Sequence, residues 1–305
     1  MTELRAPGHE PIIIGEVVKA PFARLPDPGK LFADRSLRLN ALAERHALRP
    51  YLLFLAELSA VQHRLQAGVP DPHLPSAEAL ARARERRMPP LDRAHVASDP
   101  AIDMAWCQLT AMADGMAMPD AARLALERVK SATPADQAEM IGAVLSNAIP
   151  AERLADHVFI AAALQVHFAR LAVRLDAGAL VRVGDGLCPA CGSPLVASMV
   201  VGWSGAQGAR FCACSLCGTF WNYPRVRCTL CGATKGIAYQ EIEGGPTTVK
   251  AETCESCRGY VKMLYQQHES LLDPIADDVA TLALDLLLRD SGYRRGAINP
   301  FLLGY

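Results

Sequence analysis

Long apolar runs are missing from this chain of 305 residues. A membrane-spanning helix needs about 18 or more consecutive apolar residues, whereas the nearest candidate, Val158–Leu164, is soon followed by Gln165 and His167. A secretory signal is missing as well, because charged residues such as Glu3 and Arg5 lie close to a short apolar run. The sequence therefore predicts a protein without a membrane span that stays in the cytoplasm.

Neither sign of charge is in excess, since 31 Lys and Arg face 32 Asp and Glu and the formal net charge is −1. Residues 186–265 hold seven basic and four acidic side chains, far from the dense basic stripe typical of nucleic-acid binding. The hydrophobic content of 51% also excludes disordered and collagen-like classes. We therefore expect a globular protein, and this charge pattern disfavours a nucleic-acid partner.

The common signatures of catalysis are absent from the sequence. It contains no Gly-rich phosphate loop, no nucleophile elbow and no order of Ser, His and Asp that suggests a catalytic triad. The sequence therefore predicts a protein that is not an enzyme.

Residues 1–185 have the hydrophobic periodicity of successive helices, and proline or a capping residue stands at most of the predicted starts. In the last predicted helix the apolar residues recur three and four apart, which predicts a single apolar stripe. Cys107 lies in an apolar helical pattern and is predicted to be a small buried hydrophobic residue. The predicted helices cover residues 29–48, 50–67, 76–87, 99–113, 119–131, 133–149 and 150–176.

Nine of the ten cysteines lie between positions 188 and 257. A constant offset of 40 residues carries the first four paired cysteines onto the last four, and Gly192 onto Gly232. This pattern indicates a tandem duplication of one small module. The eight paired cysteines form four Cys-x-x-Cys motifs: Cys188 and Cys191, Cys214 and Cys217, Cys228 and Cys231, and Cys254 and Cys257.

The spacing of these pairs is typical of metal sites. Two thiolates in one tight turn can bind the same ion, and two such turns form a tetrahedral four-sulfur site. The segment between the two turns of each module is predicted to form a hairpin. Disulfides are disfavoured in a cytoplasmic chain, and a thioredoxin-like redox pair does not explain a duplicated spacing. We expect the first two pairs to bind one ion and the last two pairs another, while an interleaved pairing stays open.

Bound metal is expected to hold the modules together, because each copy has few large apolar side chains and cannot bury a core of its own. Four thiolates suit either zinc or a single iron. No ligand other than sulfur is evident, so neither site keeps an open position for a catalytic water. Cys212 is the additional thiol, and because Glu252 stands at its repeat position we expect it to be free.

The cysteine-rich region and the tail resemble the FdhE family of formate dehydrogenase accessory proteins. The resemblance rests on CPACGSPLVAS, RFCACSLCGTFWNYPRVRCTLCG and KAETCESCRGYVKMLYQ, and on DPIADDVATLALDLLL with GYRRGAINPF at the end. These motifs lie within residues 188–305, whereas residues 1–185 share only helical character and length with the family. Cys212 is the one visible departure from the family pattern.

The resemblance implies a cytoplasmic assembly or maturation factor that binds the catalytic subunit of respiratory formate dehydrogenase before export. It also implies rubredoxin-like modules in which iron is favoured and zinc is possible. The expected fold class is α plus small β, with an all-helical N-terminal domain, two tandem rubredoxin-like or zinc-ribbon four-cysteine modules and a C-terminal helix. The expected domain boundaries are 1–185, 186–225, 226–265 and 266–305.

Two other functions remain as alternatives, namely rubredoxin-like electron transfer and, less favoured, zinc-ribbon binding of nucleic acid. For an assembly factor, exposed aromatic residues are candidate client contacts. Packing within the modules is the alternative for Trp221 and Tyr223. Three aspartates near the start of the tail helix are candidates either for helix capping or for a client contact. The aromatic candidates are Trp203, Phe220, Trp221 and Tyr223, and the acidic candidates are Asp273, Asp277 and Asp278.

Overall fold

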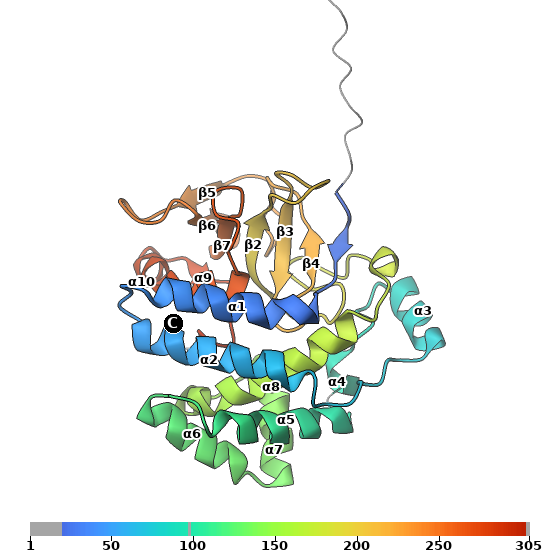
Figure 1. The fold of residues 1–305 in the computed structure, drawn as a ribbon. Coiled ribbons are helices and arrows are strands. Elements are labelled where there is room, and N and C mark those ends of the chain that lie inside the picture. The colour runs from blue at the N-terminus through green and yellow to red at the C-terminus, as the bar shows by residue number, and fades with distance from the viewer. Residues whose placement is uncertain (1–19, 97–98, 303–305) are drawn as a thin grey trace, which may run out of the picture.

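Helices dominate the first half of the computed structural model, which describes residues 20–96 and 99–302. Figure 1 shows these helices below a single sheet, with α1 and the later helix α9 lying where the two parts meet. The predicted fold class is confirmed. The helices of this half are α1 (Pro28–Ala43), α2 (Arg49–Leu65), α3 (Ala77–Glu85), α4 (Arg93–Val96), α5 (Pro100–Ala113), α6 (Asp120–Lys130), α7 (Pro134–Ser146) and α8 (Leu154–Ala172).

The helix starts follow from short-range capping interactions that the sequence already displays. The Asp27 side chain accepts a hydrogen bond from the Gly29 amide, and a proline occupies the first position of α1. Thr133 and Asp136 form a reciprocal capping box at the start of α7. These caps satisfy backbone donors that have no partner inside the helix.

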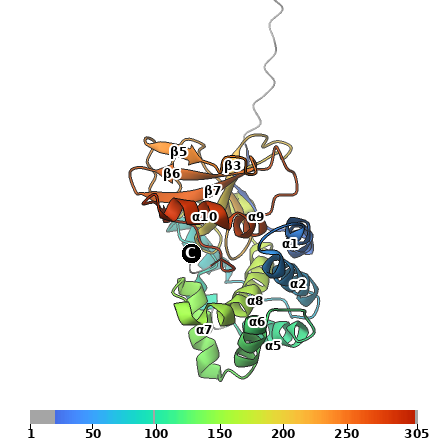
Figure 2. The ribbon, with the colours of Figure 1, turned by 90° about the vertical axis from the view of Figure 1, so that its left-hand side faces the viewer.

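Helix α8 is more deeply buried than the sequence predicted. The expected single stripe is wrong, because side chains outside it, such as Phe159 and Val166, are also buried. Figure 2 shows α8 in the middle of the helical part, and its neighbours include α2, α5, α6 and α7. A helix that is surrounded on all sides buries apolar residues all round. A 3₁₀ turn at Ala151–Arg153 precedes it, and the helix ends at Ala172 rather than near residue 176.

The prediction for Cys107 is also wrong, because this thiol is exposed. The buried residues of α5 include Ile102, Trp106 and Leu109, which recur at helical spacing on the side that faces the core. Cys107 follows Trp106 directly and is therefore turned away from that side. Its low polarity in the sequence did not reveal this orientation.

The second half of the chain forms most of one eight-stranded sheet with the order β1-β4-β3-β2-β7-β6-β5, and β8 pairs with β7. Each cysteine module contributes three strands, in which the hairpins predicted between the cysteine pairs are present. The strands are β1 (Ala23–Arg24), β2 (Leu195–Val200), β3 (Arg210–Cys214), β4 (Phe220–Asn222), β5 (Ile237–Gln240), β6 (Val249–Cys254), β7 (Gly259–Tyr265) and β8 (Arg294–Arg295).

The two modules are joined to each other through this sheet. Strand β2 of the first module pairs in parallel with β7 of the second, with Ser198 opposite Met263. Strand β1 belongs to the N-terminal part that was predicted to be all helical, and it pairs with β4 at the sheet edge. The prediction of an all-helical N-terminal part therefore misses one short strand, which two residues of isolated sequence could not indicate.

The predicted C-terminal helix is divided into α9 (Pro274–Ala280) and α10 (Leu282–Arg289) at Thr281. Asp273 caps α9 by accepting hydrogen bonds from the amides of Ile275 and Ala276. Both helices lie beside β7 in Figure 2, between the sheet and the rest of the helices.

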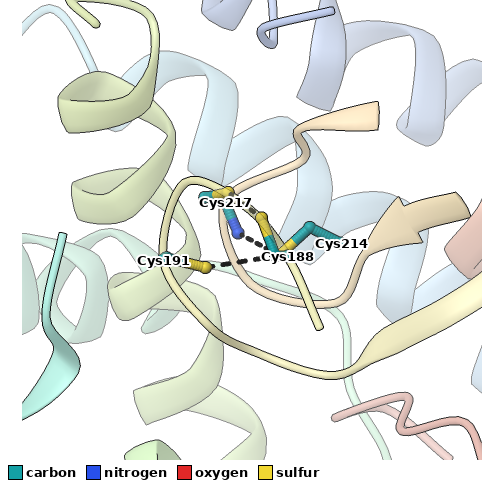
Figure 3. A group of neighbouring side chains, drawn as sticks. All are labelled: Cys188, Cys191, Cys214 and Cys217. Carbon is teal, nitrogen blue, oxygen red and sulfur yellow. Dashed lines mark hydrogen bonds between the residues drawn. The ribbon is translucent and has the colours of Figure 1, made fainter. Parts of the chain in front are cut away.

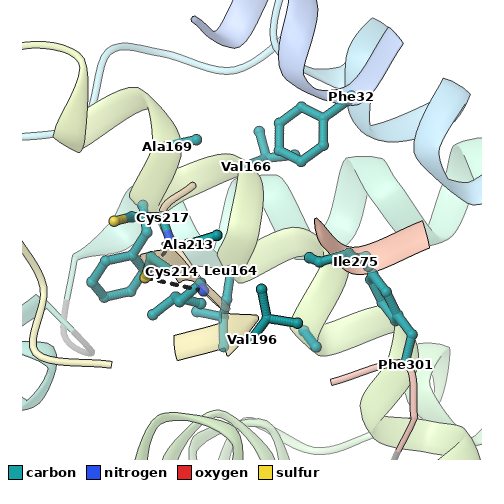
Figure 4. Packing of buried hydrophobic residues seen from close by; sticks show 14 of the residues in the cluster. Phe32, Leu164, Val166, Ala169, Val196, Ala213, Cys214, Cys217, Ile275 and Phe301 are labelled. Carbon is teal, nitrogen blue, oxygen red and sulfur yellow. Dashed lines mark hydrogen bonds between the residues drawn. The ribbon is translucent and has the colours of Figure 1, made fainter. Parts of the chain in front are cut away.

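The sheet and the helices share one hydrophobic core. Figure 4 shows Phe32 of α1, Val166 of α8 and Val196 of β2 converging on it, together with Ile275 and Phe301 from the tail. Cysteines of the first module belong to this core as well. Within residues 20–96 and 99–302, no helix combines the length and the apolar character that a membrane crossing requires.

Candidate metal centres

The first four-cysteine group lies where the sheet meets α8. Figure 3 shows Cys188, Cys191, Cys214 and Cys217 pointing toward one another from two turns. The sulfur atoms of Cys188 and Cys217 are 3.6 Å apart, and those of Cys191 and Cys214 are 3.5 Å apart. All four ligand atoms lie within 4.8 Å of one another.

Local backbone geometry explains why these turns form. Gly192 follows the first pair with a φ of 72°, a left-handed conformation that glycine adopts without a steric penalty. A Cβ atom there would also meet the Pro89 ring at 2.8 Å. In the second turn, the amides of Leu216 and Cys217 each donate to the Cys214 sulfur at 3.3 Å. Such amides stabilise negative charge on a thiolate.

The second four-cysteine group repeats this arrangement in the other module. The sulfurs of Cys228 and Cys257 are 3.8 Å apart, and those of Cys231 and Cys254 are 3.7 Å apart. Gly232 has a φ of 75°, matching Gly192 in the first copy. The structure thus brings the eight predicted cysteines together in the sequential groups, and the interleaved pairing is not seen.

The donor sets fit a tetrahedral metal ion. A metal–sulfur bond of about 2.3 Å places the sulfurs of a regular tetrahedron about 3.8 Å apart, close to the separations of 3.5–3.8 Å found here. A disulfide would need about 2.05 Å. Burial raises the pKa of the Cys188 and Cys217 thiols, so a cation is needed to stabilise the thiolate forms together. Zinc and iron both suit this donor set.

The two centres differ in their exposure to solvent. All four cysteines of the first group are buried, whereas Cys231 and Cys257 of the second group are exposed. The first centre is covered by α8 and by the segment after α3, where the Leu91 amide donates to the Ala190 carbonyl at 2.9 Å. An ion in the second centre would therefore be more accessible to a chelator or an oxidant than an ion in the first.

Cys212 belongs to neither four-cysteine group. It lies on β3 opposite Ser198 and Trp221, fully buried. Burial raises its pKa to about 12, so that the thiol stays protonated and is a poor ligand.

Several of the candidate contact residues are not available to a partner. Trp221 and Tyr223 are 2% and 1% exposed, so the packing alternative holds for them. Trp203 and Phe220 are half-buried and contact each other edge to face, and the Arg24 guanidinium lies over the Trp203 ring. These two remain partly accessible.

The three aspartates of the tail are buried as well, so the client contact proposed for them is wrong. Asp273 caps α9, as the capping alternative predicted. Asp277 pairs with Arg38 at 2.7 Å, and Asp278 pairs with Lys262 at 3.2 Å. Each of these three carboxylates forms an ion pair inside the fold.

One interaction that sequence reasoning missed joins the two modules. Arg210 on β3 and Glu252 on β6 form a buried ion pair at 2.8 Å. Arg210 also donates to the Ser198 hydroxyl and to the Arg227 carbonyl in the connection between the modules. The signal was Glu252 itself, which occupies the repeat position of buried Cys212. A carboxylate at a buried strand position requires a partner.

Comparison with known proteins shows the same sequence family along the described chain. Family models match residues 20–185 as the FdhE N-terminal region, residues 187–225 as the FdhE central domain and residues 226–302 as the FdhE C-terminal domain.

Individual relatives agree. A protein from Rhizobium meliloti named "Protein FdhE homolog" is 46% identical over 97% of both chains. One of the same name from Stutzerimonas stutzeri is 36% identical over 93% of both chains. The crystal structure of the FdhE protein from Pseudomonas aeruginosa has a TM-score of 0.83 at 35% identity, covering 93% of this chain and 99% of that one.

Proposed function

The chain belongs to the FdhE family, and on that premise we propose that it is a cytoplasmic accessory protein for respiratory formate dehydrogenase. In this role it binds the catalytic subunit before that subunit is exported, and it acts as an assembly or maturation chaperone rather than as an enzyme. The observation that carries the proposal is the match to all three parts of the family over residues 20–185 and 187–302.

We further propose that each four-cysteine group holds one metal ion, with iron favoured by the family resemblance and zinc possible. The ligands are Cys188, Cys191, Cys214 and Cys217 in one centre and Cys228, Cys231, Cys254 and Cys257 in the other. A bound ion would hold four thiolates together and stabilise the turns that carry them. Four protein sulfurs leave no position for a substrate water, which supports a non-enzymatic role.

Affinity capture from the native cytosol tests the proposed client. The tagged full-length protein is captured from cells that express formate dehydrogenase, and the bound proteins are identified by mass spectrometry. We expect enrichment of the catalytic subunit over a capture with the tag alone. A Cys212→Ala variant is the matched control, because this buried thiol lies outside both centres, and it should capture the subunit as well as the wild type. Absence of an expressed catalytic subunit from the wild-type capture would contradict the proposal.

Electron transfer is the second candidate, and the exposed sulfurs of Cys231 and Cys257 favour it. A single iron with four thiolates changes oxidation state reversibly, whereas zinc has no redox chemistry. A purified protein that contains zinc and shows no redox-dependent absorbance would remove this candidate. Iron with a reversible redox change would keep it beside the accessory role.

A further inference from the structure

We propose that a groove beside α3 binds an acidic amphipathic segment of a protein partner. The groove has a volume of about 180 Å³ and lies between α3 and the chain around residues 175–181. Figure 1 places α3 at the edge of the molecule, next to the yellow-green segment that leads into the first cysteine turn. The inference rests on the proposed function, since the client is the partner expected to carry such a segment.

Apolar side chains make up most of the groove. On the α3 side, the lining includes Leu80 within the helix and Met88, which follows the end of the helix at Glu85. On the other side, Leu175, Leu180 and Pro189 line it. Met88 is 50% exposed, which leaves a large flexible apolar side chain at the mouth of the groove. Methionine at such a surface adapts to a partner's apolar side chains.

Helix α3 is nine residues long, and none of its side chains is buried. Its own ends stabilise it through the Ser76 side chain, which caps the first turn, and through a hydrogen bond from the Met88 amide to the Ala83 carbonyl. Tertiary packing usually supplies most of the stability of a short helix. The side of α3 that carries Leu80, together with Met88 just beyond the helix, is therefore open to a partner.

The charges around the groove select for carboxylates. Arg84 lines it midway between Leu80 and Met88, and three further arginines stand on or directly after the same helix. One carboxylate, that of Asp176, also lines the groove, and it accepts a hydrogen bond from the Gly178 amide. The four exposed arginines form no ion pair with any residue that the structure describes: Arg82, Arg84, Arg86 and Arg87.

The lining favours a peptide over a nucleic acid. Single-stranded nucleic acids bind through bases that stack on aromatic side chains, and no aromatic residue lines the groove in the described part of the chain. A peptide that presents leucine-like side chains to the floor and carboxylates to the arginines matches both features. Such a segment would be an acidic amphipathic helix.

The groove is also joined to the first metal centre. Pro189 lies between the two cysteines of the first turn, and the neighbouring Ala190 carbonyl accepts the Leu91 amide hydrogen bond. Formation of the groove therefore depends on a folded first turn.

Fluorescence anisotropy with the full-length protein tests this proposal. The probe is a labelled amphipathic helical peptide of leucine and glutamate, and the comparison peptide has lysine in place of glutamate. We expect the acidic peptide to bind, with an affinity that falls as salt is raised, and the basic peptide not to bind. Arg84→Glu and Met88→Asp should each weaken binding about tenfold, which corresponds to about 1.4 kcal/mol. Arg289→Glu, an exposed arginine on α10, should bind like the wild type.

Equal binding of the acidic peptide by the wild type and both groove variants would overturn the proposal. So would tighter binding of a single-stranded oligonucleotide that Met88→Asp does not affect, because that result would identify a nucleic-acid surface. The same variants in the capture experiment separate the two proposals. If the wild type and Arg84→Glu capture the catalytic subunit equally well, the proposed function stands and the groove is not the docking site. If the wild type binds the acidic peptide but captures no catalytic subunit, the peptide-binding groove stands and the proposed function fails.

Discussion

Replacement of Cys188 by serine is expected to unfold more than the module that contains it. Structural zinc contributes about 10–16 kcal/mol in small peptides, which is comparable to the whole stability of a typical domain, about 5–15 kcal/mol. Cys188 is fully buried and belongs to the core that the sheet shares with the helices. Circular dichroism should show loss of cooperative helix melting in this variant, because helix signal in this fold depends on that core.

Two variants define the specificity of this effect. Cys254→Ser disturbs the second centre, in which two of the four cysteines are exposed. Hydrogen exchange should therefore increase in residues 226–265 while α2 and α8 stay protected. Cys212→Ala removes a buried sulfur outside both centres and should cost only about 1–2 kcal/mol. A Cys188→Ser protein that melts like Cys212→Ala would contradict the structural role of the first centre.

The second large effect is expected at Lys262, whose ammonium group is buried in a cluster of charges. It lies 3.2 Å from Asp278, pairs with Asp285 and donates to the Asp278 and Thr281 carbonyls. Lys262→Met would leave two buried carboxylates with Arg295 as their remaining charged partner. Removal of one member of a buried ionic cluster costs about 3–5 kcal/mol. Urea denaturation should show this loss as a lower midpoint.

Lys250→Met on the neighbouring strand is the matched control. Lys250 lies opposite Met263 in the sheet, and its partner Glu241 is 49% exposed. A surface ion pair of this kind contributes about 0–1 kcal/mol. If both lysine variants lost the same small amount of stability, the buried charge cluster around Lys262 would not stabilise the packing of the tail against the sheet.

Local features of the fold could be predicted from the sequence because their causes lie close together in the chain. The capping residues Asp27, Ser76 and Thr133 mark three helix starts directly. The cysteine spacing and the offset of 40 residues predicted two four-sulfur groups and the hairpins between their turns. In each case a turn or cap requires particular residues within a few positions.

Long-range packing could not be predicted in this way. The pairing of β2 with β7 joins the modules into one sheet, and neither strand carries a mark that identifies the other. The burial of α8 on all sides depends on helices that are distant in sequence. The Arg210–Glu252 pair likewise joins residues 42 positions apart. Such contacts depend on how elements assemble, which hydrophobic periodicity alone does not encode.

Metal content and metal release test the central claim most directly. The purified full-length protein and Cys254→Ser are analysed by elemental mass spectrometry, and metal loss to a coloured chelator is followed over time. The two four-cysteine groups predict two ions per chain, released in two phases, with the faster phase arising from the centre that contains exposed Cys231 and Cys257. Cys254→Ser should hold one ion, and its metal release should lack the faster phase. A folded wild-type protein without zinc or iron, or a single release phase that Cys254→Ser leaves unchanged, would contradict the account.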